Sequence, residues 1–361
     1  MNILFLDQFS DLGGAQQVLL ELLPAVRARG WRAVVGLPGD GKLVGAVRDL
    51  GLEVERIAGW SSTRQFISKT LPLALQIRAL AMRTNAGLLY LNGPRLLPAA
   101  VLSGVSCPVL FHSHSWLSEG NARTAAGLSL WCKQARVVAN CEFVAKQWWR
   151  YVRADRISTI LNGVPGPAEM PPRRRNGPPR IGCLGRIDPR KGQREFVAAA
   201  ARIHESLPEC RFAVYGEAMF GDSNVHGYAA EVRRAAAGLP IEFSGWVTDV
   251  YGALAELDLL LVPSLVAEAT TRVIPEAYAA GVPVIAFDCG GIPEVVRNGV
   301  TGILTRSVEE MARESVALLS GDPERRQSMA RAARAEWERR FTLPRFHEAL
   351  LAVMEEWARS N

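Results

Sequence analysis

Residues 262–297 read VPSLVAEATTRVIPEAYAAGVPVIAFDCGGIPEVVR and contain two glutamates, Glu268 and Glu276, with seven residues between them. Thr270 and Thr271 lie between these glutamates, and threonine is a favourable N-cap for the helical run that follows. A helix start presents free backbone N–H groups and the positive end of the helix dipole, which suits a phosphate. We therefore expect a phosphate at this helix start, with one carboxylate on each side.

The same stretch carries a family pattern. The two glutamates, followed by Gly281-Val-Pro-Val and Gly290-Gly-Ile-Pro-Glu, resemble the E-x7-E signature of the family 4 (GT4) retaining glycosyltransferases. This resemblance implies the α/β GT-B fold, in which two Rossmann-like, doubly wound parallel-sheet domains face a central cleft. The family usually has a Gly-Phe-Gly-like run after its first glutamate. Here Ala269, Thr270 and Thr271 stand in its place, which leaves the donor sugar open.

Length and composition are those of a globular protein. The chain has 361 residues, enough for two domains, and its hydrophobic content is 48%. We find no apolar run long enough to span a membrane, and the start reads as a buried strand rather than a signal peptide. The six cysteines show no metal-ligand spacing, so we expect free thiols in a reducing cytoplasm. The predicted location is cytoplasmic, with the inner face of the membrane as an open alternative.

Positive charge is concentrated in the first half. Residues 1–170 hold 18 lysines and arginines against 11 acidic residues, a net +7, whereas the remainder has 24 against 25, a net −1. A basic first half favours an anionic surface or substrate, such as acidic lipid headgroups or a phosphorylated acceptor. No nucleic-acid-binding motif accompanies the charge, so we expect no nucleic-acid partner.

The first domain begins with a strand, a glycine loop, a helix and a second strand, within residues 2–37. Gly13 and Gly14 stand where the loop enters the helix, and glycine there lets the backbone approach an anion closely. GT4 enzymes resemble this chain in carrying Gly-Gly-Ala after their first strand. The resemblance therefore assigns both glycines to the donor site.

Residues 61–83 form a basic amphipathic stretch that includes Lys69, Leu71, Leu75 and Arg78. Such a stretch can lie on a membrane surface. It can equally be a helix that faces the core and exposes its basic side to solvent, and this second interpretation is the one we favour.

Two histidines follow a predicted strand at residues 108–111. His112 and His114 stand near the carboxyl end of that strand, where open α/β sheets bind ligands. Two histidines without a nearby carboxylate or cysteine make an incomplete metal site. By resemblance to GT4 enzymes, His112 is expected to face the donor sugar, with His114 as the alternate or as a contact for the acceptor.

The second domain opens with a strand and a basic loop. Arg186 and Lys191 lie between a strand and a helix, and two cations so placed can grip a diphosphate. They match the Gly-Arg…Lys-Gly element by which the family holds the donor pyrophosphate. Arg190 is expected to face solvent. The resemblance further assigns donor contacts to Gly216, Gly245, Trp246, Thr270, Thr271, Arg272, Val273 and Glu276.

Prolines suggest the domain boundary. Residues 165–179 hold six prolines and cannot form a helix or a central strand. We predict an N-terminal acceptor-binding domain over residues 1–165, a linker over 166–179 and a nucleotide-sugar-binding domain over 180–340. By resemblance to GT-B enzymes, an amphipathic helix over 341–361 crosses back to the first domain.

The predicted activity is retaining transfer of a sugar, of the hexosyltransferase type, from a nucleotide sugar to a sugar or lipid-linked acceptor. Arg186, Lys191, the Gly13–Gly14 amides and the helix start would stabilise the leaving diphosphate. Glu268 would hold sugar hydroxyls and Glu276 the ribose. The chain has no Asp-x-Asp, so we expect no metal or other cofactor.

Four alternatives stay open. A sugar-nucleotide 2-epimerase shares the GT-B architecture and would use Asp7 or Asp11 as its acid/base carboxylate. The others are a sugar phosphorylase or trehalose-type synthase, a nucleotide-sugar-binding protein without activity, and a glycosyltransferase that acts on a secondary metabolite.

Overall fold

The computed structural model describes residues 1–59, 63–170, 177–218, 223–265 and 268–360. The chain divides into two compact units. Unit 1 comprises Met1–Gly163 together with Leu343–Asn361, and unit 2 comprises Val164–Thr342. Residues 171–176 of the expected linker lie outside the described part of the chain.

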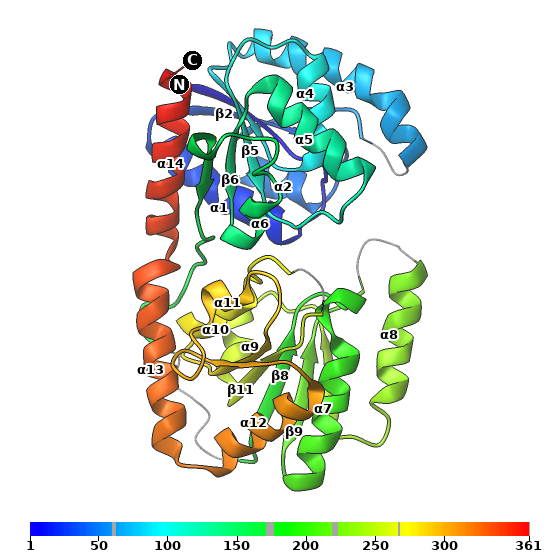
Figure 1. Cartoon of the computed structure of the whole chain (residues 1–361), viewed down its shortest axis with the longest axis vertical. Coiled ribbons are helices and arrows are strands. Elements are labelled where there is room, and N and C mark those ends of the chain that lie inside the picture. The colour runs from blue at the N-terminus through cyan, green and yellow to red at the C-terminus, as the bar shows by residue number, and fades with distance from the viewer. Residues whose placement is uncertain (60–62, 171–176, 219–222, 266–267, 361) are drawn as a thin grey trace. The chain divides into compact units, whose positions relative to one another are not determined.

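Unit 1 is built on a parallel sheet of seven strands in the order β3-β2-β1-β4-β5-β6-β7. Figure 1 labels β2, β5 and β6 of this sheet. The strand order reverses between β1 and β4. In open α/β sheets such a reversal leaves a crevice at the carboxyl ends of the strands, where ligands bind. The strands are β1 (Asn2–Leu6), β2 (Arg32–Leu37), β3 (Glu53–Arg56), β4 (Leu88–Leu91), β5 (Val109–Ser113), β6 (Arg136–Ala139) and β7 (Ile157–Thr159).

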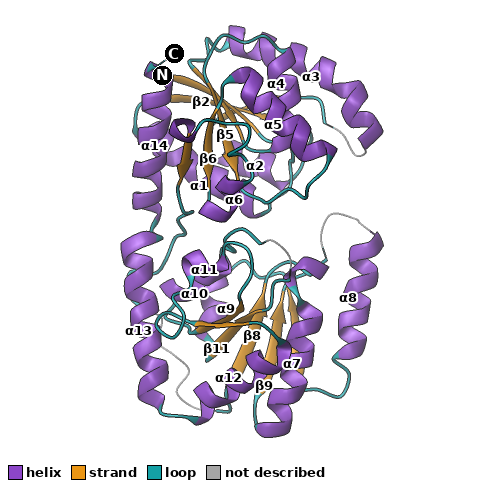
Figure 2. Ribbon diagram, viewed as in Figure 1, coloured by secondary structure: helices purple, strands orange, loops and turns teal. Residues whose placement is uncertain are grey.

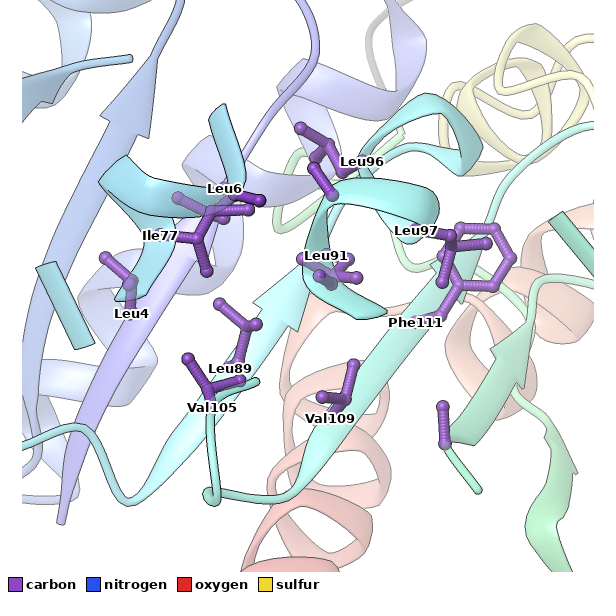
Figure 3. Close-up of a cluster of buried hydrophobic side chains, with 14 of the residues drawn as sticks. Leu4, Leu6, Ile77, Leu89, Leu91, Leu96, Leu97, Val105, Val109 and Phe111 are labelled. Atoms are coloured by element: carbon purple, nitrogen blue, oxygen red, sulfur yellow. The ribbon is translucent and has the colours of Figure 1, made fainter. Parts of the chain in front are cut away.

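Helices cover both faces of this sheet. Side chains alternate between the faces along a strand, so Leu4 and Leu6 point to one layer and Ile3 and Phe5 to the other. Figure 3 shows the first layer, where Leu89 and its neighbours on β4 and β5 meet helical side chains. The helices are α1 (Gly14–Ala28), α2 (Lys42–Asp49), α3 (Thr63–Arg83), α4 (Leu97–Leu102), α5 (Asn121–Lys133) and α6 (Glu142–Lys146).

Unit 2 has a parallel sheet of six strands in the order β10-β9-β8-β11-β12-β13. Its strand order reverses between β8 and β11. The strands are β8 (Arg180–Leu184), β9 (Arg211–Tyr215), β10 (Ile241–Gly245), β11 (Leu259–Val262), β12 (Val284–Phe287) and β13 (Ile303–Thr305). Figure 2 shows helices flanking the strands in each unit. Those of unit 2 are α7 (Gln193–Ser206), α8 (Ser223–Ala235), α9 (Val250–Ala255), α10 (Val273–Ala279), α11 (Ile292–Val295), α12 (Val308–Ser320) and α13 (Pro323–Arg340).

The last helix, α14 (Leu343–Arg359), belongs to unit 1. Its buried side chains, Phe346, Leu350, Leu351 and Met354, enter the core layer that also holds α1 and α2. The Trp357 indole donates a hydrogen bond of 3.0 Å to the carbonyl oxygen of Val109. The second core layer of unit 1 therefore contains residues from both ends of the chain.

The predicted α/β fold with two parallel sheets is confirmed. Helix α3 (Thr63–Arg83) lies within the basic amphipathic stretch of residues 61–83. Within the described residues, no helix is long and apolar enough to cross a membrane.

Candidate functional site

The predicted donor residues of unit 2 meet at the carboxyl edge of its sheet. Arg186 and Lys191 follow β8, and Glu268 follows β11, the neighbouring strand across the reversal in strand order. Open α/β sheets bind ligands at such a point, because the loops leave the two strands in opposite directions and open a crevice. The topology thus places the two cations beside the first glutamate of the E-x7-E pattern.

Lys191 and Glu268 are directly paired. The lysine Nζ lies 2.6 Å from Glu268 Oε2, and both side chains keep some exposed surface. The pair joins two loops that are separated by 77 positions in the sequence. A charge-assisted hydrogen bond at this distance orients both groups. It leaves the carboxylate further lone pairs and the ammonium further protons with which to bind a ligand.

Arg186 is oriented by an aspartate that the sequence analysis did not identify. Asp188 is buried and accepts a hydrogen bond of 2.7 Å from Arg186 Nη2. It also accepts bonds from Arg190, through Nε at 3.1 Å and Nη2 at 2.9 Å. Burial alone would raise the pKa of Asp188, but the hydrogen bonds and charge of Arg190, aided by Arg186, hold it well below its usual range. Asp188 is therefore an anion that fixes the basic loop.

Arg190, which was expected only to face solvent, also binds Asp188. Its side chain is 66% exposed, as a solvent-facing residue would be, yet its guanidinium is bound to Asp188. A signal for this was present in the sequence, because an aspartate before Pro189 favours a turn closed by its own side chain. Asp188 indeed accepts the backbone N–H of Arg190 at 3.0 Å.

The helix after Glu268 starts later than predicted. Arg272 is the residue that precedes α10, and no side chain caps the helix start. The expectation that Thr270 or Thr271 is the N-cap is therefore wrong. Thr271 instead is buried, and its carbonyl oxygen accepts the Ile274 N–H at 3.3 Å.

Glu276 lies in the first turn of α10, as expected from the sequence. It is almost fully buried, and Arg272 Nε lies 3.3 Å from its Oε1. Val273 is the first residue of the helix. Glu268 and Glu276 thus flank the helix start, each paired with a different cation.

Close backbone contacts hold the loops of this edge together. The Gly291 N–H donates to the carbonyl oxygen of Glu268 at 2.9 Å, and a Cβ at Gly290 would overlap that same oxygen. A Cβ at Gly192 would overlap the carbonyl oxygen of Pro263, and Gly192 has a φ of +73°. Glycine is required at both positions by these approaches and by positive φ.

The remaining predicted donor residues of unit 2 lie on neighbouring strands of the same edge. Gly216 follows β9, and its N–H donates to the carbonyl oxygen of Gly245 at 2.7 Å. Gly245 ends β10, and Trp246 after it is exposed. An exposed tryptophan beside two glycines offers a flat apolar surface, which suits a nucleotide base.

A second cluster of polar residues lies at the reversal point of the unit 1 sheet. Asp7, after β1, has no exposed surface and accepts hydrogen bonds from Gln16 Nε2 at 2.9 Å and Asn92 Nδ2 at 2.6 Å. Burial raises the pKa of Asp7 to about 6, although these hydrogen bonds act against it. Asn92 follows β4 and is itself buried. Neither Gln16 nor Asn92 was singled out from the sequence, since no motif marks them.

The two histidines have different environments. His112 is within β5 and has no exposed surface, because it points into the layer beneath α14 and its Nδ1 bonds the Tyr90 hydroxyl. His114 lies past the strand end, on the same side, with the ring centroids 3.9 Å apart. Burial lowers the pKa of both rings, that of His114 to about 3. The expectation that His112 faces the sugar does not fit this placement, whereas His114 is partly exposed.

Gly13 and Gly14 lie near this second cluster in the fold. Gly13 precedes α1 and has extended backbone, with no side-chain cap, and Gly14 is the first residue of the helix. The Gly13 carbonyl accepts the Gln17 N–H at 2.9 Å. The backbone N–H groups of this helix start are thus at the carboxyl edge of the sheet, as predicted.

In the described part of the chain, no three histidine, cysteine, aspartate or glutamate side chains are grouped closely enough to hold a metal ion. All six cysteines are free thiols.

The fold of the two units defines a class of α/β proteins with two Rossmann-like units. Family comparison specifies the class further. Residues 12–165 match the model described as Glycosyltransferase Family 4, and residues 178–321 match the model described as Glycosyl transferases group 1. The chain belongs to the GT4, or group 1, family of glycosyltransferases.

Individual relatives agree with this assignment. The chain is 31% identical over 224 residues to a D-inositol 3-phosphate glycosyltransferase of Segniliparus rotundus, covering 56% of this chain and 49% of that protein. It is 27% identical to a phosphatidyl-myo-inositol mannosyltransferase of Mycobacterium leprae, over 98% of this chain and 96% of the relative. The match spans about half the length of several of the curated relatives, including the first.

The fold is similar to that of solved structures. Anabaena Alr3699/HepE, crystallised in complex with UDP and glucose, superposes with a TM-score of 0.84 at 24% identity. The superposition covers 98% of this chain and 99% of that one.

Proposed function

We propose that this protein is a retaining glycosyltransferase that moves a hexosyl group from a nucleotide sugar to an acceptor without a metal ion. One observation carries the proposal. Lys191 and Glu268 are paired at 2.6 Å at the reversal point of the unit 2 sheet. In this proposal the lysine binds the diphosphate and the adjacent glutamate binds the sugar.

Cleavage of the sugar–diphosphate bond leaves negative charge on the phosphate oxygen. Arg186 and Lys191 stabilise that charge, and because Asp188 already holds the Arg186 guanidinium, little reorganisation is needed when it develops. This electrostatic assistance replaces the metal ion that some other glycosyltransferases use. Metal independence is therefore part of the proposal.

The two glutamates bind different parts of the donor. Glu268, oriented by Lys191, accepts hydrogen bonds from sugar hydroxyls, and Glu276, held by Arg272, accepts those of the ribose. Trp246 and the glycines beside it receive the base.

Retention follows from a front-face displacement. The acceptor hydroxyl oxygen forms its bond to the anomeric carbon on the side from which the diphosphate leaves. The leaving phosphate oxygen takes the acceptor proton as the old bond breaks. This scheme needs no nucleophile from the protein. The neutral ring of His114 serves as a polar contact for the substrates rather than as a base.

We propose an anionic, lipid-linked acceptor in the assembly of a cell-envelope or exported polysaccharide. The net +7 of residues 1–170 supports this choice. Relatives point the same way, since one is named as a phosphatidyl-myo-inositol mannosyltransferase. An acceptor panel tests the proposal, and better turnover of neutral soluble acceptors than of lipid phosphates would contradict it.

The first test is a thermal-shift panel of UDP, GDP, ADP and dTDP sugars in the presence of EDTA. Binding to the native state raises Tm by mass action. We expect a shift with one nucleotide family, loss of that shift in Arg186→Ala, and its retention in Arg202→Ala. Arg202 is a matched control, because it is an exposed arginine on α7 that pairs with Glu309. No shift with any donor would contradict the donor site, and a shift only without EDTA would contradict metal independence.

The epimerase alternative loses support from the geometry of unit 1. Asp7 has no exposed surface, and its carboxylate already accepts hydrogen bonds from Gln16, Asn92 and the Phe9 N–H. Asp11 is exposed at the surface.

A further inference from the structure

Three helices of unit 1 carry no acidic residue. Helices α3, α4 and α5 lie side by side on one face of the sheet (Figure 1), and α4 contacts both of the others. Residues 56–118 contain six lysines and arginines and no aspartate or glutamate, and α5 adds Arg123 and Lys133. Among the described helices of ten or more residues, every other one contains at least one acidic residue. The charged side chains of these three helices are thus all basic.

The same helices expose large apolar side chains. On α3 the buried residues face the sheet, while Leu71, Leu75 and Met82 recur at helical spacing on the outer side. Leu75 is 62% exposed, and Trp131 near the end of α5 is 66% exposed. We define the α3–α5 face by its exposed apolar residues, which are Leu71, Leu75, Met82, Leu102, Leu128 and Trp131.

Basic side chains lie among these apolar residues. Lys69 and Arg78 are exposed on α3, and Arg78 follows Leu75 by three positions, on the same side of the helix. Gly104, which follows Leu102, lies beside the Arg78 guanidinium, so that cation reaches from α3 towards α4. Lys133 bonds the carbonyl oxygen of Val105 at 2.6 Å, at the other border of α4. The acidic groups next to this face are paired, Glu55 with Arg83 and Glu119 with Arg123.

A surface that combines exposed leucine, methionine and tryptophan with the exposed cations Lys69 and Arg78 matches one partner well. The apolar side chains enter the boundary between lipid headgroups and acyl chains, and the cations bind the anionic headgroups. A soluble anionic polymer would satisfy the charge but not the apolar side chains. A second copy of this chain would bring the same cations against each other.

We propose that the α3–α5 face docks on an anionic lipid bilayer. Under this proposal α3 faces the core with its buried side, as observed, and the membrane with its outer side. The inference does not rest on sugar-transfer chemistry, because the face contains none of the residues of the candidate donor site.

The test is sedimentation of the full chain with sucrose-loaded vesicles, made of phosphatidylcholine alone or with an equal share of phosphatidylglycerol. We expect binding only to the anionic vesicles, and weaker binding at high salt. Two double variants probe the face: Leu71→Glu with Leu75→Glu, and Lys69→Glu with Arg78→Glu. Each should lower the partition coefficient by roughly tenfold or more.

Matched controls lie in unit 2. Val300→Glu places a charge at an exposed apolar residue, and Arg234→Glu with Arg325→Glu reverses two exposed cations on α8 and α13. Both controls should bind like the wild type. The nucleotide-induced thermal shift of every variant reports on folding and on the donor site separately, so failure of membrane binding is distinguishable from failure of the proposed function.

Three results would overturn the proposal. The first is equal sedimentation with and without phosphatidylglycerol. The second is unchanged binding by the face variants. The third is a stable dimer of the wild type in analytical ultracentrifugation that is lost in the double variant Leu71→Glu with Leu75→Glu. A second copy of the chain would then cover the face.

Discussion

Asn92 fixes the hydrogen-bonding state of His114. The amide nitrogen of Asn92 donates to Asp7 at 2.6 Å and to the carbonyl oxygen of Ala15 at 3.1 Å, so its oxygen must face the other way. That oxygen lies 2.7 Å from His114 Nε2, which therefore carries the proton. The ring is then neutral with its lone pair on Nδ1, in agreement with its lowered pKa.

Asn92→Leu should reduce kcat about 10- to 100-fold. The ring of His114 loses the hydrogen bond that orients it, and one such bond to a buried group is worth about 1–3 kcal/mol. Nitrogen NMR of the imidazole should show a mixture of tautomers in the variant and a single tautomer in the wild type.

Thr84→Val is the matched control for Asn92→Leu. Thr84 is also buried in unit 1, directly after the end of α3, and its hydroxyl donates to the carbonyl oxygen of Leu80 at 2.8 Å. This control should lower Tm without changing kcat. An equal loss of kcat in both variants would show that Asn92 acts only through stability.

Substitutions of the two glutamates of the E-x7-E pattern should have different effects in binding and kinetic experiments. Glu268→Gln should lower kcat about 100-fold while leaving the affinity for the free nucleoside diphosphate unchanged, since the proposed contact is to the sugar. Glu276→Gln should lower the affinity for the free nucleoside diphosphate about tenfold, since the proposed contact is to the ribose. Calorimetry with the nucleotide alone, together with steady-state kinetics, measures both effects, and the reverse pattern would exchange the two roles.

Gly192→Ala should lower the free energy of unfolding by more than backbone strain alone accounts for. Gly192 and Gly299 have φ values of +73° and +76°, but a Cβ at Gly192 would overlap the Pro263 carbonyl, whereas nothing lies within 4 Å at Gly299. Gly299→Ala should therefore destabilise by about 1–2 kcal/mol, the usual cost of left-handed backbone. Gly192→Ala should destabilise further and abolish the nucleotide-induced thermal shift, because the Lys191 loop must move. Equal melting temperatures and equal thermal shifts in the two variants would disprove this.

Asp7 should make stability depend on pH in an unusual direction. Its pKa is raised in the folded state to about 6, from 3.8, so its contribution is greatest below about pH 4 and is lost as pH rises through about 6. Between these limits the difference should reach about 3 kcal/mol. His112 and His114 act in the opposite sense over part of this range, because their lowered pKa values favour the native state at higher pH.

Comparison with Asp7→Asn isolates the effect, since both proteins keep the histidines. The free energy of unfolding of the wild type, relative to the variant, should fall between pH 4 and pH 6. Chemical denaturation at fixed pH values measures this difference. A constant difference across the range would mean that Asp7 titrates normally.

Much of the fold could be predicted because its elements are strongly patterned. The buried strands, such as Leu259–Val262, are continuous apolar runs that suit parallel sheets covered on both faces. Helix α5 was not predicted, because small residues such as Gly127 stand where it packs. A Cβ there would overlap the Tyr151 ring, so close packing replaces the usual apolar periodicity.

The candidate site was predicted only in part, for a different reason. Arg186, Lys191 and Glu268 belong to local motifs that can be read along the chain. Asn92 and Gln16 take part because the topology brings the end of β4 and the start of α1 next to Asp7, and no local pattern signals that. The burial of His112 depends on α14, which lies over 200 positions away in the sequence.

The contribution of α14 to unit 1 has a consequence for biosynthesis. On the ribosome, all of unit 2 emerges before the segment that supplies Phe346, Leu350 and Met354 to the core of unit 1. Domains generally fold in the order in which they leave the ribosome. Here the first unit to be translated is the last to fill its core, and until then the apolar side chains of α1 that α14 will cover stay accessible to chaperones.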